Sequence, residues 1–366
     1  MRILAVNAGS SSLKLSVVGK NDELILSENL PSPGGSVDAD ELHRTMERAG
    51  SLDAVGHRIV HGGTEFVEPV LIDERVVRRL HALSDLAPLH QPKSLRGLEI
   101  VSRVLPNLPA VASFDTAFHA HMPEAAATYA LPPEWRKRWD LRRFGFHGLS
   151  HAYASRRAAE LAGREIVGFR VVTCHLGAGA SLAAVAGGIS VDTTMGFTPL
   201  EGLVMATRSG SIDPGLLLWL EEHVGMPPSE LASTLEHRSG LLGLTGSADM
   251  RAVLGAEAAG NRDAALAIEV YLHRLRAGIA AMAAAMDGLD ALVFTGGVGE
   301  RSAAIRERAA GGLFFLGVAL DAHANADPQL DAEIGAAGAA VRTFVIEARE
   351  DLQIAHDVRG VLGATP

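Results

Sequence analysis

The sequence predicts an α/β protein built of two lobes. Its 366 residues exceed a single ordinary domain, so two lobes with separate cores are expected. A unit of strand, glycine turn and strand occurs near the start of the chain and again near its middle, which favours a shared plan for the two lobes. Helical patterns alternate with the strands, and this alternation is typical of layered α/β folds.

The first unit opens the chain. A β-rich run from Ile3 to Val6 is followed by a turn of Gly9 and three serines, and a second run extends from Leu13 to Val18. Short apolar runs joined through glycine predict a hairpin. Asn7 and Lys14 flank its turn.

The second unit starts at Val171. Runs at 171–174 and 182–185 enclose a glycine-containing turn and predict a second hairpin, and a Gly-Gly pair leads into a third strand. Residues 171–191 contain no Asp, Glu, Lys or Arg, as a membrane span would, but His175 and the glycines interrupt the apolar surface. We therefore expect paired buried strands here and no membrane span.

A third strand ends at glycines late in the chain. The run from Ala291 to Thr295 precedes Gly296, Gly297 and Gly299, and residues 302–308 have a helical pattern. A loop of this kind places backbone N–H groups and a helix N-terminus beside a phosphate. Further helices are expected at Asp73–Ser84, Ser150–Leu161, Arg262–Met286 and Asp351–Val361.

The residue types near these turns suit phosphoryl transfer. Glycine and serine turns let a polyanion approach the backbone, and the transfer itself needs fixed positive charge around the phosphoryl oxygens. Arginines and histidines recur in turn-like contexts, at Arg58, His90, His119, His147, His175 and Arg208. Mg²⁺ needs only one or two carboxylates with waters and phosphates, so a preformed acidic cluster is not required. Together these features favour phosphate binding over separate structural hairpins.

Composition excludes several other classes. The formal net charge of −10 disfavours sequence-independent binding of nucleic acid. The one basic cluster, at residues 136–138 and 142–143, is expected to be a solvated connector between lobes. The chain has a single cysteine, Cys174, and no evident export signal, so we expect the protein in the reducing cytoplasm.

The main alternative from the residues alone is a dinucleotide-binding fold. The P-loop motif and the motifs of zinc proteases and α/β-hydrolases are absent from the sequence. One part of the chain has the spacing of a nicotinamide dehydrogenase. It consists of strand 291–295, Gly297-x-Gly299, a helix, and a run from Phe314 to Leu320 that leads to Asp321. The third glycine of that fingerprint is replaced by Ser302, which weakens this alternative.

A set of ordered blocks resembles the acetate kinase family. The blocks are VNAGSSSLK (6–14), GHRIVHGG (56–63), APLHQP (87–92), FDTAFH (114–119), RFGFHGLSH (143–151), HLGAGAS (175–181), VDTTMGFTPLEGLVMATRSG (191–210), SADMR (247–251) and FTGGVGE (294–300). They extend from the first strand to the last third of the chain. The resemblance implies a two-lobed actin-like (RNase H-like) duplicated α/β fold with an active-site cleft between the lobes. It implies an N-terminal lobe of residues 1–145, a C-terminal lobe of 146–348, and a helix of 349–366 that packs back on the first lobe.

The resemblance also implies the reaction and its residues. The reaction is the reversible, in-line transfer of the γ-phosphoryl group of ATP to acetate, which gives acetyl phosphate and ADP. The resemblance also implies Mg²⁺ as cofactor and a homodimer as the assembly. The implied catalytic residues are Arg58, Asp115, His147 and Arg208, and the implied metal ligands are Asn7 and Glu350. The implied pocket for the acyl methyl group is Val60, Leu89, Phe146 and Pro199. The implied nucleotide-binding residues are Ser10, Ser12, Lys14, His175, Gly177, Gly179, Asp249, Met250, Arg251, Gly297 and Val298.

Departures from the family pattern leave alternatives open. Ala178, Arg301 and Arg349 stand where the family has asparagine, and all three touch the expected nucleotide or metal site. Pyrophosphate or another nucleotide is therefore an alternative donor. Propionate is an alternative acceptor, because one methylene changes discrimination by only about 1–3 kcal/mol. A nucleotide-binding regulator without catalysis is the alternative from another functional class.

Overall fold

The computed structural model describes residues 1–9, 12–32, 37–86 and 91–363. Two of the expected site residues, Ser10 and Leu89, lie outside the described residues. Contacts divide the chain into unit 1, which comprises residues 1–120, 146–153 and 349–366, and unit 2, which comprises 121–145 and 154–348. Residues 121–145 thus belong to unit 2, and residues 146–153 and 349–366 belong to unit 1.

Unit 1 contains a sheet with helices on both faces. Its elements are β1 (Ile3–Ala8), β2 (Ser12–Val18), β3 (Leu24–Pro31), α1 (Ala39–Ala49), β4 (Ala54–Ile59), β5 (Val70–Leu71), α2 (Glu74–Ala82), a 3₁₀ turn (Ser84–Leu86), α3 (Gln91–Val104), β6 (Ala110–Phe114), a second 3₁₀ turn (Ala117–His119) and α15 (Glu350–Val361). Helix α6 (Gly148–Ala162) begins in unit 1 and continues in unit 2.

Unit 2 repeats this architecture with more helices. Its elements are α4 (Glu124–Ala127), α5 (Pro133–Trp139), β7 (Arg170–Leu176), β8 (Ala180–Ala186), β9 (Ile189–Thr193), α7 (Pro214–Trp219), a π-helical segment (Leu220–Val224), α8 (Pro228–His237), α9 (Gly240–Thr245), α10 (Met250–Ala258), α11 (Arg262–Ala284), β10 (Ala291–Thr295), α12 (Gly296–Arg301), α13 (Ala303–Gly311), a 3₁₀ turn (Phe314–Leu316), α14 (Ala322–Ala326), β11 (Ala332–Glu333) and β12 (Arg342–Val345).

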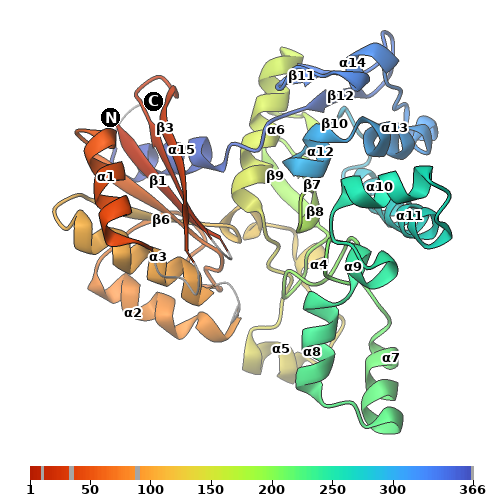
Figure 1. Ribbon diagram of the computed structural model, residues 1–366, viewed down its shortest axis with the longest axis horizontal. Coiled ribbons are helices and arrows are strands. Elements are labelled where there is room, and N and C mark those ends of the chain that lie inside the picture. Colours follow the sequence, from red (N-terminus) through yellow and green to blue (C-terminus); the bar gives the residue numbers. More distant parts are fainter. Residues whose placement is uncertain (10–11, 33–36, 87–90, 364–366) are drawn as a thin grey trace. The chain divides into compact units, whose positions relative to one another are not determined.

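The two sheets have the same plan (Figure 1). The strand order is β3-β2-β1-β4-β6-β5 in unit 1 and, read from the matching edge, β9-β8-β7-β10-β12-β11 in unit 2. In each sheet the first three strands are antiparallel, the next two run parallel to the central strand, and a short antiparallel strand forms the far edge. This confirms the expected two-lobed, duplicated α/β fold, including the paired buried strands within residues 171–191.

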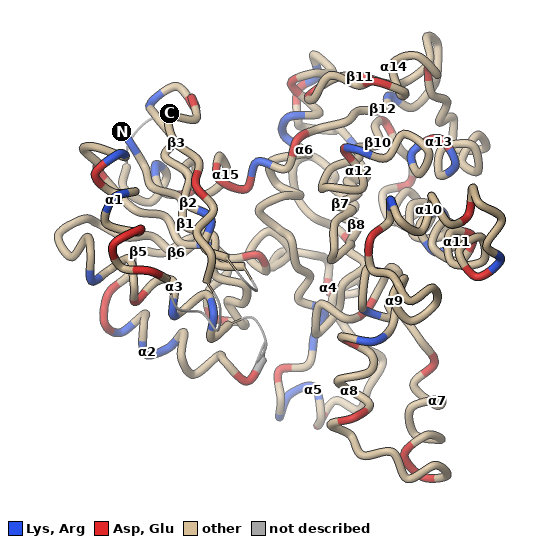
Figure 2. Tube along the Cα trace, in the orientation of Figure 1, with Lys and Arg blue, Asp and Glu red and all other residues tan. Residues whose placement is uncertain are grey.

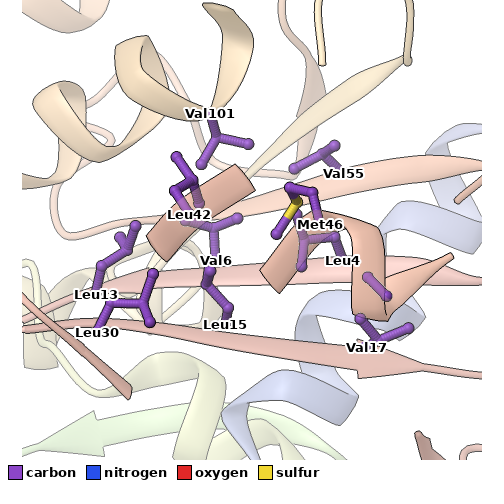
Figure 3. Close-up of a cluster of buried hydrophobic side chains, with 11 residues drawn as sticks. Leu4, Val6, Leu13, Leu15, Val17, Leu30, Leu42, Met46, Val55 and Val101 are labelled. Carbon is purple, nitrogen blue, oxygen red and sulfur yellow. The ribbon is translucent and has the colours of Figure 1, made fainter. Parts of the chain in front are cut away.

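One face of the unit 1 sheet is covered by α1 and α3. Leu4 and Val6 of β1 point to this face, because side chains alternate along a strand. Figure 3 shows them packed with Leu42 and Met46 of α1 and with Val101 of α3. The hydrophobic burial in this cluster fixes the register of β1, since a one-residue slip would move Leu4 and Val6 to the opposite face of the sheet.

The opposite face is covered by the C-terminal helix. Ile354, Ala355 and Val358 of α15 pack with Ile3 and Ala5 of β1. Helix α15 also contacts β4 and β6. The last helix of the chain thus completes the core of unit 1.

One local expectation was wrong. Gly296 begins helix α12 directly after β10, where a glycine loop was expected before a helix at Ser302. Phe314–Leu316 forms a 3₁₀ turn, so the strand that a dinucleotide fold needs after the late helix is not formed there. The first three residues of the basic cluster form the last turn of α5 (Figure 2), where positive charge stabilises the helix dipole. Lys137 and Arg138 are exposed there, as expected of a solvated segment.

Helix length and hydropathy also bear on the membrane question. Among the helices of the described residues, none combines the length and the hydropathy that crossing a membrane requires.

Candidate functional site

A charged cluster lies at the carboxyl ends of the parallel strands of unit 1. Arg58 is near the end of β4, and Asp115 directly follows the neighbouring strand β6. The Arg58 guanidinium binds the Asp115 carboxylate through two hydrogen bonds, from Nε to Oδ1 at 2.9 Å and from Nη2 to Oδ2 at 2.6 Å. Such two-point contacts fix the guanidinium in direction as well as position.

Asn7 and Glu350 join this cluster. Arg58 Nη1 donates a hydrogen bond to Asn7 Oδ1 at 3.0 Å and lies 3.3 Å from Glu350 Oε2. Asn7 Nδ2 donates to the same Glu350 oxygen at 2.7 Å. Glu350 is the first residue of α15, where a helix N-terminus favours negative charge. The cluster therefore assembles four residues from the start, the middle and the end of the sequence.

The pKa values of the buried pair follow from burial and pairing. Burial lowers the pKa of Arg58, but the negative charges of Asp115 and Glu350 together raise it by more, so the pKa of Arg58 lies above its ordinary value. Burial raises the pKa of Asp115, and the Arg58 guanidinium opposes this rise. The result is a cation held in place by carboxylates, with 19% of the Arg58 side chain accessible.

His147 enters the same region with an unusual backbone. Its φ is 56°, in the left-handed region that non-glycine residues rarely adopt and that is commonly found at functional sites. The next residue, Gly148, donates its N–H to the Asp115 carbonyl at 3.0 Å, and a Cβ on Gly148 would lie 2.0 Å from that oxygen. Only glycine permits this approach. The hydrogen bond between Gly148 and Asp115 thus holds the neighbouring His147 close to Asp115.

Two buried histidines support Phe146: His119, which the sequence analysis singled out, and His61, which it did not. A ring nitrogen of His119 lies 3.1 Å from the Phe146 carbonyl oxygen, and the rings of His61 and Phe146 meet edge to face with centroids 5.6 Å apart. Burial lowers the pKa of His119 to about 4, so its ring is neutral at pH 7. Val60, also expected to line the acyl pocket, is half-buried next to His61. The sequence signal for these supports was the FDTAFH and GHRIVHGG blocks.

The first glycine-serine turn brings two further expected residues to Asn7. The Gly9 N–H donates to the Ser12 carbonyl at 2.8 Å and closes the turn between β1 and β2. Lys14 pairs directly with Asn7 across the hairpin and is exposed. Opposite residues of an antiparallel pair share one face of the sheet, so Lys14 and Asn7 project on the same side.

The donor set of this cluster fits a magnesium ion. Mg²⁺ prefers oxygen ligands and is usually held by one or two carboxylates together with waters and substrate phosphates. Asn7 supplies an amide oxygen and Glu350 a carboxylate, and the two side chains are in contact. Within the described residues no group of three or more His, Cys, Asp or Glu is placed to hold a metal.

A cavity of about 700 Å³ lies within unit 2. Six expected nucleotide-binding residues line it: Gly177, Asp249, Met250, Arg251, Gly297 and Val298. Its other walls include Ala178 and Arg301, two of the positions that depart from the family pattern. The fold thus gathers residues from the β7–β8 turn, α10 and α12 around one space of ligand size.

The wall formed by α12 depends on close backbone packing. Gly296 has a φ of +76°, and a Cβ there would lie 2.9 Å from the Leu176 carbonyl oxygen at the end of β7. The Glu300 carboxylate accepts hydrogen bonds from the N–H groups of Gly296 and Ala348. At the other end of α12, the buried Arg306 donates to the carbonyls of Gly299 and Glu300. Sequence reasoning missed Glu300 and Arg306, although Glu300 ends the FTGGVGE block.

The opposite wall begins with a capped helix. Asp249 accepts a hydrogen bond from the Arg251 N–H as the N-cap of α10 and also forms an ion pair with the Arg251 guanidinium at 2.9 Å. These bonds lower the pKa of Asp249 to about 2. Tyr271 of α11 is a further lining residue that sequence reasoning missed, and its buried hydroxyl has no hydrogen-bond partner within the described residues.

Arg208 is a half-buried cation in unit 2. Its Nη1 donates to the Pro199 carbonyl at 3.1 Å, and Pro199 is itself an expected substrate residue. Burial lowers the pKa of Arg208. The charge of Glu236 opposes this lowering. His175, Gly179, Arg208 and Pro199 belong to unit 2 but are not among the residues that line the cavity.

The sequence and fold were compared with known proteins. The model of the acetokinase family matches residues 36–356. An acetate kinase of Bacillus mycoides is 43% identical, and the alignment covers 98% of each protein. Among solved structures, a propionate kinase from Francisella tularensis is 35% identical with a TM-score of 0.89 and covers 97% of this chain and 98% of that chain. The acetate kinase of Porphyromonas gingivalis is 34% identical with a TM-score of 0.89 and covers 99% of both chains.

Proposed function

Because this chain belongs to the acetokinase family, we propose that it catalyses the reversible transfer of the γ-phosphoryl group of ATP to acetate, giving acetyl phosphate and ADP. The observation that carries the proposal is the pair of sites described above. Unit 1 holds Arg58 between Asp115 and Glu350, and unit 2 gathers six expected nucleotide-binding residues around one cavity.

The reaction needs no general base. An acetate carboxylate is ionised at neutral pH and can attack the γ-phosphorus directly, with ADP leaving in line. The charge that spreads over the phosphoryl oxygens must be neutralised, and fixed donors do this without reorganisation. We assign this role to Arg58 and Arg208, with His147 as a further donor. The assignment requires both guanidinium groups to act on the same phosphoryl group during the reaction.

Positioning accounts for the other residues. Asp115 holds Arg58 in direction. For Val60, Leu89, Phe146 and Pro199, the family resemblance implies contact with the methyl group of acetate. Asn7 and Glu350 would hold Mg²⁺, which supplies positive charge to the phosphates of ATP when bound.

The phosphates would lie against the glycine turns. Ser10, Ser12 and Lys14 supply donors from the first turn, and His175, Gly177 and Gly179 from the second. The adenosine would occupy the unit 2 cavity, whose size of about 700 Å³ favours a nucleoside over pyrophosphate alone.

Trapping of acyl phosphate with hydroxylamine tests the proposal. The purified protein is incubated with ATP, Mg²⁺ and acetate, and acetohydroxamate is measured. We expect stoichiometric formation of acetohydroxamate and ADP. Binding of ATP without hydroxamate would indicate a regulator and refute the proposal, and absorbance changes of a nicotinamide cofactor with a hydroxy acid would indicate a dehydrogenase.

Propionate is the second candidate acceptor, because one of the similar structures is described as a propionate kinase. Val60 favours acetate, since a smaller residue there would leave more room for the acyl chain. The same assay with both acids decides: a propionate kcat/KM well above that of acetate would assign the enzyme to propionate.

Location and assembly are further parts of the proposal. The single cysteine, Cys174, is buried and free, which suits a reducing cytoplasm. The segment from α7 through the π-helical turn exposes Leu216, Leu218, Trp219 and Val224, which supports burial of this surface in a homodimer. Sedimentation equilibrium of the protein and of Trp219→Asp tests this, and a monomeric wild-type protein would refute it.

A further inference from the structure

A long loop of unit 2 carries two residues of the proposed site. Residues 194–213, all of which the structure describes, form no helix or strand between β9 and α7. Pro199 and Arg208 lie in this loop, and Arg208 Nη1 donates a hydrogen bond to the Pro199 carbonyl at 3.1 Å. Because the loop has no ladder of backbone hydrogen bonds, side chains from other segments must hold it in place. The position of the Arg208 guanidinium therefore depends on what holds the backbone around Pro199.

Tyr129, in the segment after α4, holds this part of the loop. Its hydroxyl group donates to Glu201 Oε2 at 2.7 Å and accepts from the Phe197 N–H at 2.8 Å. One hydroxyl group thus binds the loop two residues before Pro199 and two residues after it. Burial raises the pKa of Tyr129 to about 12, and the hydrogen bond to Glu201 contributes to the rise, so the hydroxyl group stays protonated at neutral pH.

Arg143 binds the other oxygen of the same carboxylate. Its Nη2 donates to Glu201 Oε1 at 2.8 Å, and its Nη1 donates to the Thr194 carbonyl at 3.3 Å. The guanidinium also lies over the Tyr129 ring, 5.5 Å from its centre. Only 17% of the Arg143 side chain and 36% of the Glu201 side chain are accessible, and charge-assisted hydrogen bonds of this kind fix direction as well as distance. We call Tyr129, Arg143 and Glu201 the Tyr129 cluster.

The loop backbone packs tightly against the Tyr129 cluster at Gly196. A Cβ at this position would overlap both the Glu201 carboxylate and the Tyr129 hydroxyl oxygen. The Gly196 carbonyl accepts a hydrogen bond from the Phe144 N–H at 3.0 Å, next to Arg143 in the chain. The cluster and the loop therefore form one closely packed unit, in which a shift of any member moves the backbone on either side of Pro199.

We propose that the Tyr129 cluster positions the Arg208 guanidinium for phosphoryl transfer. This role rests on the proposed function, in which Arg208 binds the transferring phosphoryl group. The cluster acts through the Pro199 carbonyl, which accepts the hydrogen bond of Arg208 Nη1. A misplacement of about 1 Å at a reacting centre can lower the rate by about a hundredfold, so loosening of this carbonyl should lower kcat.

Tyr129→Phe tests the role, because it removes the hydroxyl group and keeps the ring. We expect kcat with ATP, Mg²⁺ and acetate to fall about tenfold or more. The KM for ATP should stay within about twofold, because other residues line the nucleotide cavity. Glu333→Gln is a matched control, since Glu333 binds Arg342 through two hydrogen bonds at the edge strand β11, and its kcat should stay within about twofold. An unchanged kcat in Tyr129→Phe, or an equal fall in the control, would overturn the proposal.

A double-mutant cycle separates positioning of Arg208 from general support of the fold. In the Arg208→Ala background, Tyr129→Phe should change kcat by less than about twofold, and additive losses would overturn the proposal. Gly196→Ala keeps the three side chains but forces them apart, so it should also lower kcat about tenfold or more. Wild-type kcat in this variant, shown to be folded by circular dichroism, would overturn the proposal as well. Absence of acetohydroxamate with the wild-type protein would instead refute the transfer reaction itself, and with it this role.

Discussion

Removal of the Arg58 guanidinium should destabilise unit 1 as well as stop the reaction. In Arg58→Ala, the Asp115 carboxylate loses contacts of 2.9 and 2.6 Å while it remains 1% exposed. Loss of one partner from a buried ion pair costs about 3–5 kcal/mol. This cost has an upper limit, because Asp115 can bind a proton instead of staying charged. For a carboxyl group of ordinary pKa about 3.9, staying neutral at pH 7 costs about 4 kcal/mol. We therefore expect a loss of about 3–4 kcal/mol.

A double-mutant cycle separates stability from catalysis. Asp115→Asn removes the buried charge but keeps the shape of the side chain, so the double variant Arg58→Ala/Asp115→Asn has no unpaired carboxylate. Its loss of stability should be at least about 1 kcal/mol smaller than the sum of the two single losses. Its turnover should stay as low as that of Arg58→Ala, because the cation for the phosphoryl group is still missing.

Hydrogen exchange of peptides covering residues 54–59 across a urea series reports the free energy of unfolding of unit 1 by itself. A coupling below about 0.5 kcal/mol would refute the buried ion pair, since independent sites add within that range. Recovery of turnover in the double variant would refute the catalytic role of Arg58.

The pH dependence of Arg58→Ala has a defined sign. Burial raises the pKa of Asp115, and in this variant no guanidinium opposes the rise. The native state then binds more protons than the unfolded state once the pH exceeds about 3.9, so stability falls as pH rises through the raised native pKa. The loss relative to wild type should be at least about 1 kcal/mol larger at pH 7.5 than at pH 5. A loss that is equal at both values would contradict this account.

Three further changes test the other parts of the site. Arg208→Ala should lower kcat at least about a hundredfold, as for loss of a transition-state donor worth about 2.7–4 kcal/mol, and wild-type turnover in an ADP-release assay would defeat the assignment. Gly148→Ala should lower the free energy of unfolding by about 1–3 kcal/mol, because it forces a methyl group against the Asp115 carbonyl. The control Gly360→Ala in α15 meets no atom and should raise the free energy of unfolding by up to about 1 kcal/mol. Equal melting temperatures of the two variants would contradict this account. Glu350→Gln should raise the Mg²⁺ concentration for half-maximal turnover at least about tenfold, and an unchanged magnesium titration would remove Glu350 from the metal site.

The sequence alone predicted most features that depend on neighbouring residues. The hairpins of β1–β2 and β7–β8, the strand β10 and the long helix α11 follow from local periodicity and from glycines at turns. The same reasoning failed at Gly296, because whether a glycine run forms a loop or the first turn of a helix depends on what caps it. Here the Glu300 carboxylate accepts from the Gly296 N–H and also from the N–H of Ala348, which is 48 residues away and is brought there by the fold.

The chemistry of the candidate site was predicted in kind, but the contacts between its residues were not. Composition and spacing indicate phosphate binding, and the family blocks supply the expected roles and group Asn7 with Glu350. Only the tertiary structure shows the hydrogen bond between Asn7 and Glu350, which are 343 residues apart, and that between Arg58 and Asp115, which are 57 apart. Parallel strands bring their carboxyl ends to one edge of the sheet, and α15 returns to the same unit at the end of the chain.

The Tyr129 cluster shows the same division. In the sequence, Arg143 and Glu201 belong to family blocks, whereas Tyr129 lies in none of them. Residues 194–213 form no helix or strand, so which side chains hold this loop depends on how the segment that contains Tyr129 packs against it. Local sequence determines what a chain segment can form, and long-range packing decides which polar groups meet a partner, because burial removes the water that would otherwise satisfy them.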